Sequence, residues 1–301
     1  MADSDLASRL RAKANSSLTQ PFQVVSGSSI EKTAMRIQVE GDAGTGKSDF
    51  LLSIVEHYVD TLNYPPEQVL LCIIDFDAGG VGELLEAGRL PDDLQHCVWY
   101  ANVKNVWEAY SAFGTFKKML SEHRTKYGVM GWLGIENMGA LWDSSQSCYC
   151  EEIYGMPLYQ LKLEKMKEAK SDTKKGKPTF DRMLEYGVIN SIHDGLINEV
   201  SFGDSFHMVW TTHMKLKYDE KGAAVGQIGA GKKGIDAKVR FRLRKLIHDG
   251  EFIGIVVKSR GTKEHGYAIK NPTFTNFVER VGRQFRDEGK KNVMEEWETP
   301  L

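Results

Sequence analysis

The residues best suited to chemistry form a glycine-rich loop near the start of the chain. This loop, GDAGTGKS, fits the pattern G-x-x-x-x-G-K-[ST] at every fixed position. Glycines let successive backbone N–H groups face one anion, while the lysine reaches the β- and γ-phosphates and the hydroxyl ligates Mg²⁺. The pattern therefore predicts a nucleoside triphosphate site. Its predicted phosphate-binding residues are Gly41, Asp42, Ala43, Gly44, Thr45, Gly46, Lys47, Ser48 and Asp49.

A strand and a helix must hold this loop in place. Ile37 to Val39 alternates as a short strand does, and Phe50 to Val55 begins an amphipathic run that is typical of a helix. A strand, a glycine-rich loop and a helix in this order distinguish a P-loop from an ordinary glycine turn. The positive end of the helix dipole, near Gly46, would add to the attraction for phosphate.

An acidic cluster follows the next apolar stretch of the chain. Residues 68–76 are continuously apolar up to Asp75, which is typical of a strand buried on both faces of a parallel sheet. Asp75 and Asp77 then lie where open α/β sheets bind ligands, just past the carboxyl end of a strand. The alternative interpretation is ordinary turn chemistry at a strand end.

Two further strands are predicted to end in groups that suit the same site. Residues 129–137 form an apolar strand that closes on Glu136, as in the Walker-B pattern, whose carboxylate holds Mg²⁺ or its water. Ser48, Glu136 and Asp75 are the predicted metal ligands. Residues 206–212 form another strand, followed by His213, which could contact the γ-phosphate; a purely structural histidine is the alternative.

A basic segment follows His213. From there to Lys245 the chain has ten Lys or Arg and three acids, a formal charge of +7. Five glycines in its first part predict a flexible loop over residues 214–236. A mobile basic loop beside a nucleotide site suits a polyanion, and the alternative is a solvated loop. The predicted nucleic-acid contacts are Lys215, Lys217, Lys232 and Lys233.

A hairpin is predicted next, and its second strand runs into two cations. Residues 239–247 and 252–257 alternate around the turn signal Asp249-Gly250. Lys258 and Arg260 are two residues apart, so both side chains can point the same way. An anion between them would relieve their repulsion, and solvated surface charges are the alternative.

Composition limits the classes of protein. The 301 residues are 41% hydrophobic and 27% charged, which indicates a globular chain of one large α/β domain or two small ones. The net charge of −2 excludes a general polycation. Cys148 and Cys150 lack a second ligand pair at metal spacing. No apolar run approaches 18 residues and no signal-peptide core begins the chain, so we expect a cytosolic protein, or one in a host cell's cytosol.

Three regions are expected along the chain. Residues 1–33 form a tail or short helix. Residues 34–270 form the core, with a helical and loop insertion at 144–180 and the basic loop at 214–236. Residues 271–301 form a last helix and an acidic tail.

Together these motifs resemble the RecA-like ATPases. Among them, the chain is most similar to the compact RecA-core ATPases of phages and some archaeal viruses, which include single-strand annealing proteins. The resemblance spans about residues 34–265. It rests on the order of five sequence elements: GDAGTGKS, DFDAGG, GIEN, TTHMK and VVKSRG.

The resemblance implies a fold and a role for each site residue. The fold would be α/β: a mainly parallel sheet flanked by helices, with an antiparallel C-terminal hairpin. Asp77 stands where the family places a water-activating Glu and is one methylene shorter. Glu136 matches the Walker-B acid and His213 the γ-phosphate sensor. Lys258 and Arg260 resemble the finger that hexameric relatives insert into a neighbour's site. Residues 214–236 stand where RecA proteins keep a DNA-binding loop, here with Tyr218 as its clear aromatic.

The implied function is ATP hydrolysis with Mg²⁺ between the subunits of a homo-oligomeric ring or filament. The protein would act on single-stranded nucleic acid in recombination, annealing or replication, and not on a membrane. Three alternatives stay open at this point. The chain could be an assembly factor that binds ATP as a structural ligand, an ATPase that remodels proteins, or a P-loop kinase of a small molecule.

Overall fold

The computed structural model describes residues 34–77, 80–171, 182–202, 205–218, 223–232, 234–259 and 266–283. The chain divides into two units, residues 1–33 and 34–301, and every described residue lies in the second.

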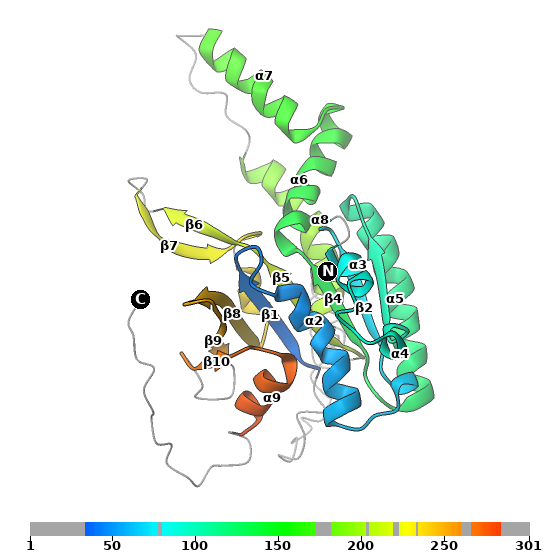
Figure 1. Cartoon of the computed structure of the whole chain (residues 1–301). Coiled ribbons are helices and arrows are strands. Elements are labelled where there is room, and N and C mark those ends of the chain that lie inside the picture. Colours follow the sequence, from blue (N-terminus) through cyan, green and yellow to red (C-terminus); the bar gives the residue numbers. More distant parts are fainter. Residues whose placement is uncertain are drawn as a thin grey trace, which may run out of the picture. The chain divides into compact units, whose positions relative to one another are not determined.

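An eight-stranded sheet forms the centre of this unit (Figure 1), with strand order β10-β9-β8-β1-β5-β4-β2-β3. The strands from β8 to β3 in this order run parallel, and β9 and β10 are antiparallel to their neighbours. The predicted α/β class, with a mainly parallel sheet and antiparallel C-terminal strands, is confirmed. The strands are β1 (Arg36–Gly41), β2 (Leu71–Asp75), β3 (Val98–Asn102), β4 (Trp132–Glu136), β5 (His207–Thr212), β8 (Phe241–His248), β9 (Glu251–Ser259) and β10 (Ala268–Lys270).

Helices cover both faces of the sheet. On one face, a core cluster joins α5, α6 and α8 to the strands through side chains such as Phe113, Leu141 and Trp210. On the other face α9 packs on α2, where the Phe50 ring lies 5.9 Å from those of Phe274 and Phe277. The longer helices are α2 (Lys47–Glu56), α3 (Gly80–Glu86), α5 (Val106–Tyr127), α6 (Met138–Tyr154), α7 (Leu158–Ser171), α8 (Arg182–Phe202) and α9 (Phe274–Arg283). Shorter turns are η2 (His57–Thr61), η3 (Pro66–Gln68), α4 (Asp92–Gln95) and η4 (Ile235–Lys238).

Local sequence explains where several elements begin and end. The Asn105 side chain accepts hydrogen bonds from the first backbone N–H groups of α5, and Gly128 ends this helix with a φ of 74°. Asp249 and Gly250 both have positive φ, 51° and 79°, as a tight hairpin turn requires. The Asp-Gly hairpin predicted between β8 and β9 is confirmed.

Part of the segment predicted as a flexible basic loop forms regular secondary structure. It contains the strands β6 (Met214–Tyr218) and β7 (Ala224–Gly229), which form an antiparallel ribbon separate from the main sheet (Figure 1). The loop prediction for this part was wrong because the alternation of Met214 and Leu216 with lysines favours a strand despite the glycines nearby. A two-stranded ribbon is only marginally stable alone. Its base is held by Ala230, whose N–H donates to His213 O at 2.6 Å and whose carbonyl accepts from Thr212 Oγ1 at 2.7 Å.

Within the described residues, no helix is both long and apolar enough to cross a membrane.

Candidate nucleotide site

The glycine-rich loop joins β1 to α2 at the carboxyl edge of the sheet. Gly44 and Gly46 have φ values of 77° and 74°, a region that favours glycine. A Cβ on Gly41 would lie 2.5 Å from both Lys245 O and Thr45 Oγ1, so only glycine fits there. Thr45 Oγ1 also donates to Asp42 O at 2.8 Å, which closes the loop on itself. The predicted strand, loop and helix are therefore confirmed as the local structure.

Lys47 lies at the centre of the site. Its ammonium donates to Asp42 O at 2.8 Å and lies 3.3 Å from Nδ1 of His213. Burial lowers the pKa of Lys47, while the negative charges of Glu136 and Asp77 act in the opposite direction. The lysine, the histidine and both acids, which lie up to 166 residues apart in sequence, thus meet at one place.

Glu136 faces the loop from the end of β4. Ser48 Oγ donates to Glu136 Oε1 at 2.9 Å, and the residue is 2% exposed. Burial raises the pKa of Glu136 to about 7, an effect that the hydrogen bond from Ser48 opposes. Glu136 Oε2 is buried without a hydrogen bond of good geometry in the described part of the chain, although the Thr211 hydroxyl is near enough to lower the pKa of this carboxyl. A buried carboxylate beside a serine hydroxyl fits a magnesium site.

Protein side chains alone would not enclose such an ion. The described residues contain no group of three or more His, Cys, Asp or Glu side chains that could hold a metal. Mg²⁺ commonly uses one or two protein ligands and completes its shell with waters and substrate phosphates. Ser48 and Glu136 match that pattern.

Asp77 is held on the other side of His213. Its Oδ2 lies 3.5 Å from His213 Nε2, and its Oδ1 accepts from Asn137 Nδ2 at 3.5 Å. The structure thus places His213 between the Lys47 ammonium and the Asp77 carboxylate. That Asp77 activates the attacking water stays a prediction.

Asp75, which was predicted as a metal ligand, accepts backbone hydrogen bonds through both of its carboxylate oxygens. Its Oδ1 accepts from Asp77 N at 2.7 Å, and its Oδ2 accepts from Val81 N at 3.2 Å. Burial raises the pKa of Asp75, while these two backbone hydrogen bonds lower it. Asp75 therefore organises the turn that carries Asp77, because both of its oxygens are directed to backbone N–H groups.

The Asp49 carboxylate, next to the loop, forms an ion pair. Its Oδ1 lies 2.7 Å from Arg89 Nε, and the same guanidinium contacts Glu56 Oε1 at 2.7 Å. This ion-pair network links α2 to the chain beyond α3. Asp49 is one of the nine residues predicted to bind phosphate, and its carboxylate forms this structural ion pair.

Much of the basic segment is already paired. Lys232 Nζ donates to Asp194, and Arg242 and Arg244 contact the fully buried Glu40 at 3.0 and 2.7 Å. The structure therefore does not support Lys232 as a free nucleic-acid contact, because its charge is matched by an acid on α8. Lys215 and Lys217 lie exposed on β6. Their contact with nucleic acid stays a prediction. Lys233 lies outside the described residues.

The predicted finger is described only in part. Lys258 Nζ donates to the backbone oxygen of Asp236, which brings the end of β9 to η4. Arg260 lies outside the described residues. The pairing of the two cations around an anion therefore stays a prediction.

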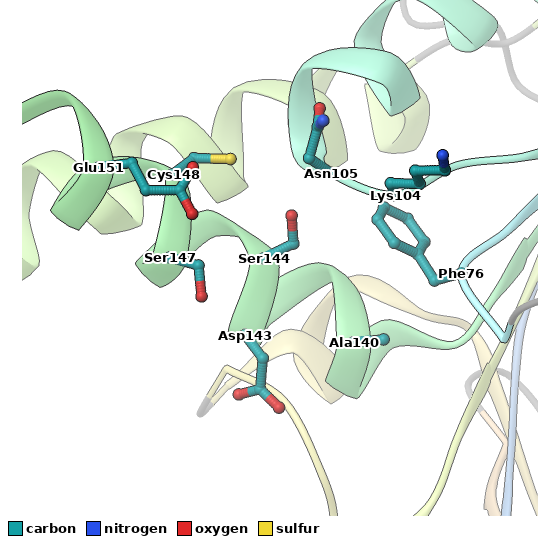
Figure 2. A pocket seen from close by; sticks show the side chains of 9 residues that line it. All are labelled: Phe76, Lys104, Asn105, Ala140, Asp143, Ser144, Ser147, Cys148 and Glu151. Atoms are coloured by element: carbon teal, nitrogen blue, oxygen red, sulfur yellow. The ribbon is translucent and has the colours of Figure 1, made fainter. Parts of the chain in front are cut away.

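A separate pocket of about 320 Å³ lies further along the same edge of the sheet (Figure 2). Of the residues that line this pocket, Phe76 is the nearest in sequence to the nucleotide site, because it precedes Asp77. Cys148 also lines it, whereas Cys150 belongs to a different cluster around Tyr149. All four cysteines are free and buried. The lining residues are Phe76, Lys104, Asn105, Ala140, Asp143, Ser144, Ser147, Cys148 and Glu151.

Two residues of the site were missed in the sequence. Asn137 caps α6 by accepting from Gly139 N at 2.8 Å while its amide reaches Asp77. An Asn between a strand and a helix is a capping signal, which could have identified it. Lys245 lies behind the loop and donates to Gly46 O at 2.5 Å. It was counted with the basic segment, and the sequence holds no signal that separates it.

Comparison with known proteins gives a result at the level of fold. The sequence matches no protein-family model and none of the curated proteins. Among solved structures, the chain is similar to a KaiC-like protein from the hyperthermophilic archaeon Pyrococcus horikoshii OT3. The identity is 12%, 82% of this chain and 88% of that one are covered, and the TM-score is 0.44. It is also similar to a RadB recombinase, with 11% identity, coverage of 79% and 87%, and a TM-score of 0.44. The sheet order and strand directions agree with the predicted α/β class, a mainly parallel sheet with antiparallel C-terminal strands.

Proposed function

We propose that this chain binds ATP with Mg²⁺ and hydrolyses it. One observation carries the proposal: Lys47, Ser48, Glu136, Asp77 and His213 converge at the carboxyl edge of the sheet through contacts of 2.9 to 3.5 Å. These residues come from four separate segments of the chain. Phosphoryl transfer needs positioning and charge stabilisation more than covalent chemistry from the protein, and this set provides both.

Each group has a distinct role in this proposal. The loop N–H groups and the Lys47 ammonium bind the phosphates, and the Ser48 hydroxyl and Glu136 hold the metal. Bound Mg²⁺ would neutralise charge that develops on the phosphate oxygens. Asp77 accepts the proton of the attacking water, and Asn137 keeps the Asp77 carboxylate in place. His213 lies between Asp77 and Lys47, where it can sense the γ-phosphate.

We further propose that the ATPase acts on single-stranded nucleic acid and works between subunits. The exposed Lys215 and Lys217 lie on the β6–β7 ribbon, whose base is bonded to His213 and Thr212. A ligand on the ribbon would thus be connected to the γ-phosphate side of the site. Lys258 and Arg260 would reach the phosphates of a neighbouring subunit. The likeness to the phage and viral group rests on the sequence motifs alone.

Phosphate release tests the proposal. ATP turnover should be measured alone and with single-stranded DNA, RNA or duplex, using Lys47→Ala as the background control. Wild-type release of phosphate that the variant lacks, increased by a single strand, is the expected result. Turnover should also rise faster than linearly with protein concentration where oligomers form. No phosphate release under any of these conditions would contradict the proposal.

One observation favours a second candidate. Asp77 has a shorter side chain than the Glu of the resembling family, and a carboxylate set back from the water would slow hydrolysis. The chain would then bind ATP as a structural ligand in an assembly or protein-remodelling factor. Tight ATP binding with no turnover, together with ATP-dependent oligomerisation, would favour this candidate. A phosphorylated small-molecule acceptor would instead indicate a kinase.

A further inference from the structure

A second lysine, outside the P-loop pattern, lies directly behind the phosphate loop. Lys245 on β8 is 4% exposed and is paired in register with Gly41 at the end of β1. Its ammonium donates to Gly46 O at 2.5 Å and to Pro272 O at 3.2 Å. Lysine is almost never this buried unless it is paired, yet no carboxylate of the described residues forms an ion pair with it. Its charge is therefore held against backbone carbonyls.

The position of Gly46 gives this contact a consequence for the nucleotide. The carbonyl of Gly46 and the N–H of Lys47 belong to the same peptide unit. A cation at that carbonyl polarises the unit and makes its N–H a stronger donor. In a P-loop this N–H faces the bound phosphates. Lys245 thus acts on the phosphate site from the opposite side of the backbone.

We propose that Lys245 is a positioning residue of the nucleotide site, holding the Gly46 carbonyl and supplying a second positive charge behind the phosphate loop. The inference rests on the proposed nucleotide binding. The inference goes beyond the proposed nucleotide binding, because the P-loop pattern assigns a charge only to Lys47. The same ammonium fixes the chain at Pro272, just before α9, to the loop.

Electrostatics around Lys245 supply a way to detect this role. Burial lowers the pKa of Lys245 to about 8; Asp49 acts against this shift, while Arg89 and Lys47 add to it. The Phe50 ring, 5.8 Å from the ammonium, is the aromatic neighbour on α2. A bound polyphosphate stabilises the charged form of a nearby lysine. The contribution of Lys245 to nucleotide affinity should therefore fall as the pH rises from 7 to 9.

The test is ADP binding by calorimetry at pH 7, 8 and 9 and constant ionic strength, with thermal melting of the nucleotide-free protein alongside. Lys245→Met removes the charge and keeps the apolar length of the side chain. It should bind ADP about 10-fold more weakly at pH 7, the effect of one pKa unit, and its affinity should change less with pH than that of the wild type. Lys117→Met, which removes an exposed lysine paired with Glu199, should match the wild type in both respects.

A second variant keeps the inference testable if Lys245→Met fails to fold. Lys245→Arg retains a charge that does not titrate below pH 12, so its affinity should fall less between pH 7 and 9 than that of the wild type. An arginine variant that loses affinity with pH as the wild type does would overturn the inference. So would a folded methionine variant that melts lower but binds ADP normally, since that marks a purely structural lysine. Absence of ADP binding by the wild type would instead refute the proposed nucleotide site, and the inference with it.

Discussion

The phosphate loop and the basic segment after β5 both contain lysines, but they hold them differently. The Lys47 side chain is buried, and the acids that face it, Glu136 and Asp77, belong to the same site. In the basic segment, Lys232, Arg242 and Arg244 form ion pairs with acids on other elements. The exposed lysines of the β6–β7 ribbon are left to bind a ligand. The difference teaches that formal charge counted along a segment overstates the charge available to a ligand. For ligand binding, the position of a cation relative to the carboxyl ends of the strands matters more than this formal charge.

The largest expected effect tests the first region. Lys47→Ala should reduce ATP turnover by about 10³-fold or more, because it removes preorganised charge stabilisation at the transferred phosphoryl group. Lys238→Ala, a change in the basic segment at a lysine that donates to Asn198, should leave turnover unchanged. Phosphate release and ADP titration of both folded variants would check this. Equal losses in the two variants would remove the distinction between the regions.

The next effect separates the two acids of the site. Asp77→Asn should bind ATP yet hydrolyse it at least ~10²-fold more slowly, the lower range for losing a general base. Glu136→Gln should instead weaken the dependence of binding on Mg²⁺. Single-turnover phosphate release and ATP titration over a range of Mg²⁺ concentrations would measure both. If Glu136→Gln alone stops turnover at saturating Mg²⁺ and Asp77→Asn does not, the two roles are reversed.

A smaller effect compares lysines within the basic segment. Reversing Lys215 and Lys217 to Glu should weaken single-strand binding and reduce its salt dependence by a slope of ~0.7 per lost phosphate contact. Lys232→Met should have less effect, because its charge already faces Asp194. Fluorescence anisotropy at several salt concentrations would give the slopes. Equal losses for Lys232 and the ribbon lysines would show that the ion pair opens in the complex.

The last comparison concerns the stability of β5, which links the two regions because it leads into His213 and then the ribbon. At its start, His207 Nδ1 accepts from Met35 N at 2.9 Å, and burial lowers the pKa of His207 to about 4. The unfolded chain binds this proton near pH 6.5, so the free energy of unfolding should fall as the pH drops from 6.5 towards 4. His207 would account for up to about 3 kcal/mol of that fall.

The variant His207→Asn provides the comparison for this prediction. Asn can accept from the Met35 N–H without taking up a proton. Its unfolding free energy should therefore fall less between pH 6.5 and 4, although the buried His193, whose pKa burial also lowers to about 4, still contributes. Denaturant titrations at several pH values would measure this. Parallel curves for variant and wild type would rule out His207 as a source of the acid sensitivity.

The parts predictable from sequence are those that depend on neighbours along the chain. The P-loop is contiguous, and the strands before Asp77, Glu136 and His213 show their burial as unbroken apolar runs, so their carboxyl ends could be placed at one edge. The Asp-Gly turn between β8 and β9 likewise depends on two adjacent residues. Backbone geometry within a few residues determines each of these features.

The parts that could not be predicted depend on partners far away in sequence. Lys232 meets Asp194 from α8, and Lys245 meets Gly46 across 199 positions. Asp75 and Asp77 have the same residue type and neighbouring places, yet only the fold shows that one serves the backbone and the other faces His213. The ordered ribbon was missed because glycines around it suggested a loop.

The place of β1 in the sheet has a consequence for how the protein is made. Its parallel neighbours are β5 and β8, in which Met208 and Phe241 pair with Arg36 and Ile37. A ribosome that adds about 5–20 residues per second needs roughly 10 to 35 seconds to extend the chain from Arg36 to Met208. During that interval the phosphate loop has been synthesised, but the strands that flank it have not. Five of the six residues of β1 are buried in the fold, and during this interval they have no sheet partners. A nascent chain halted before β5 should therefore be aggregation-prone and unable to retain nucleotide.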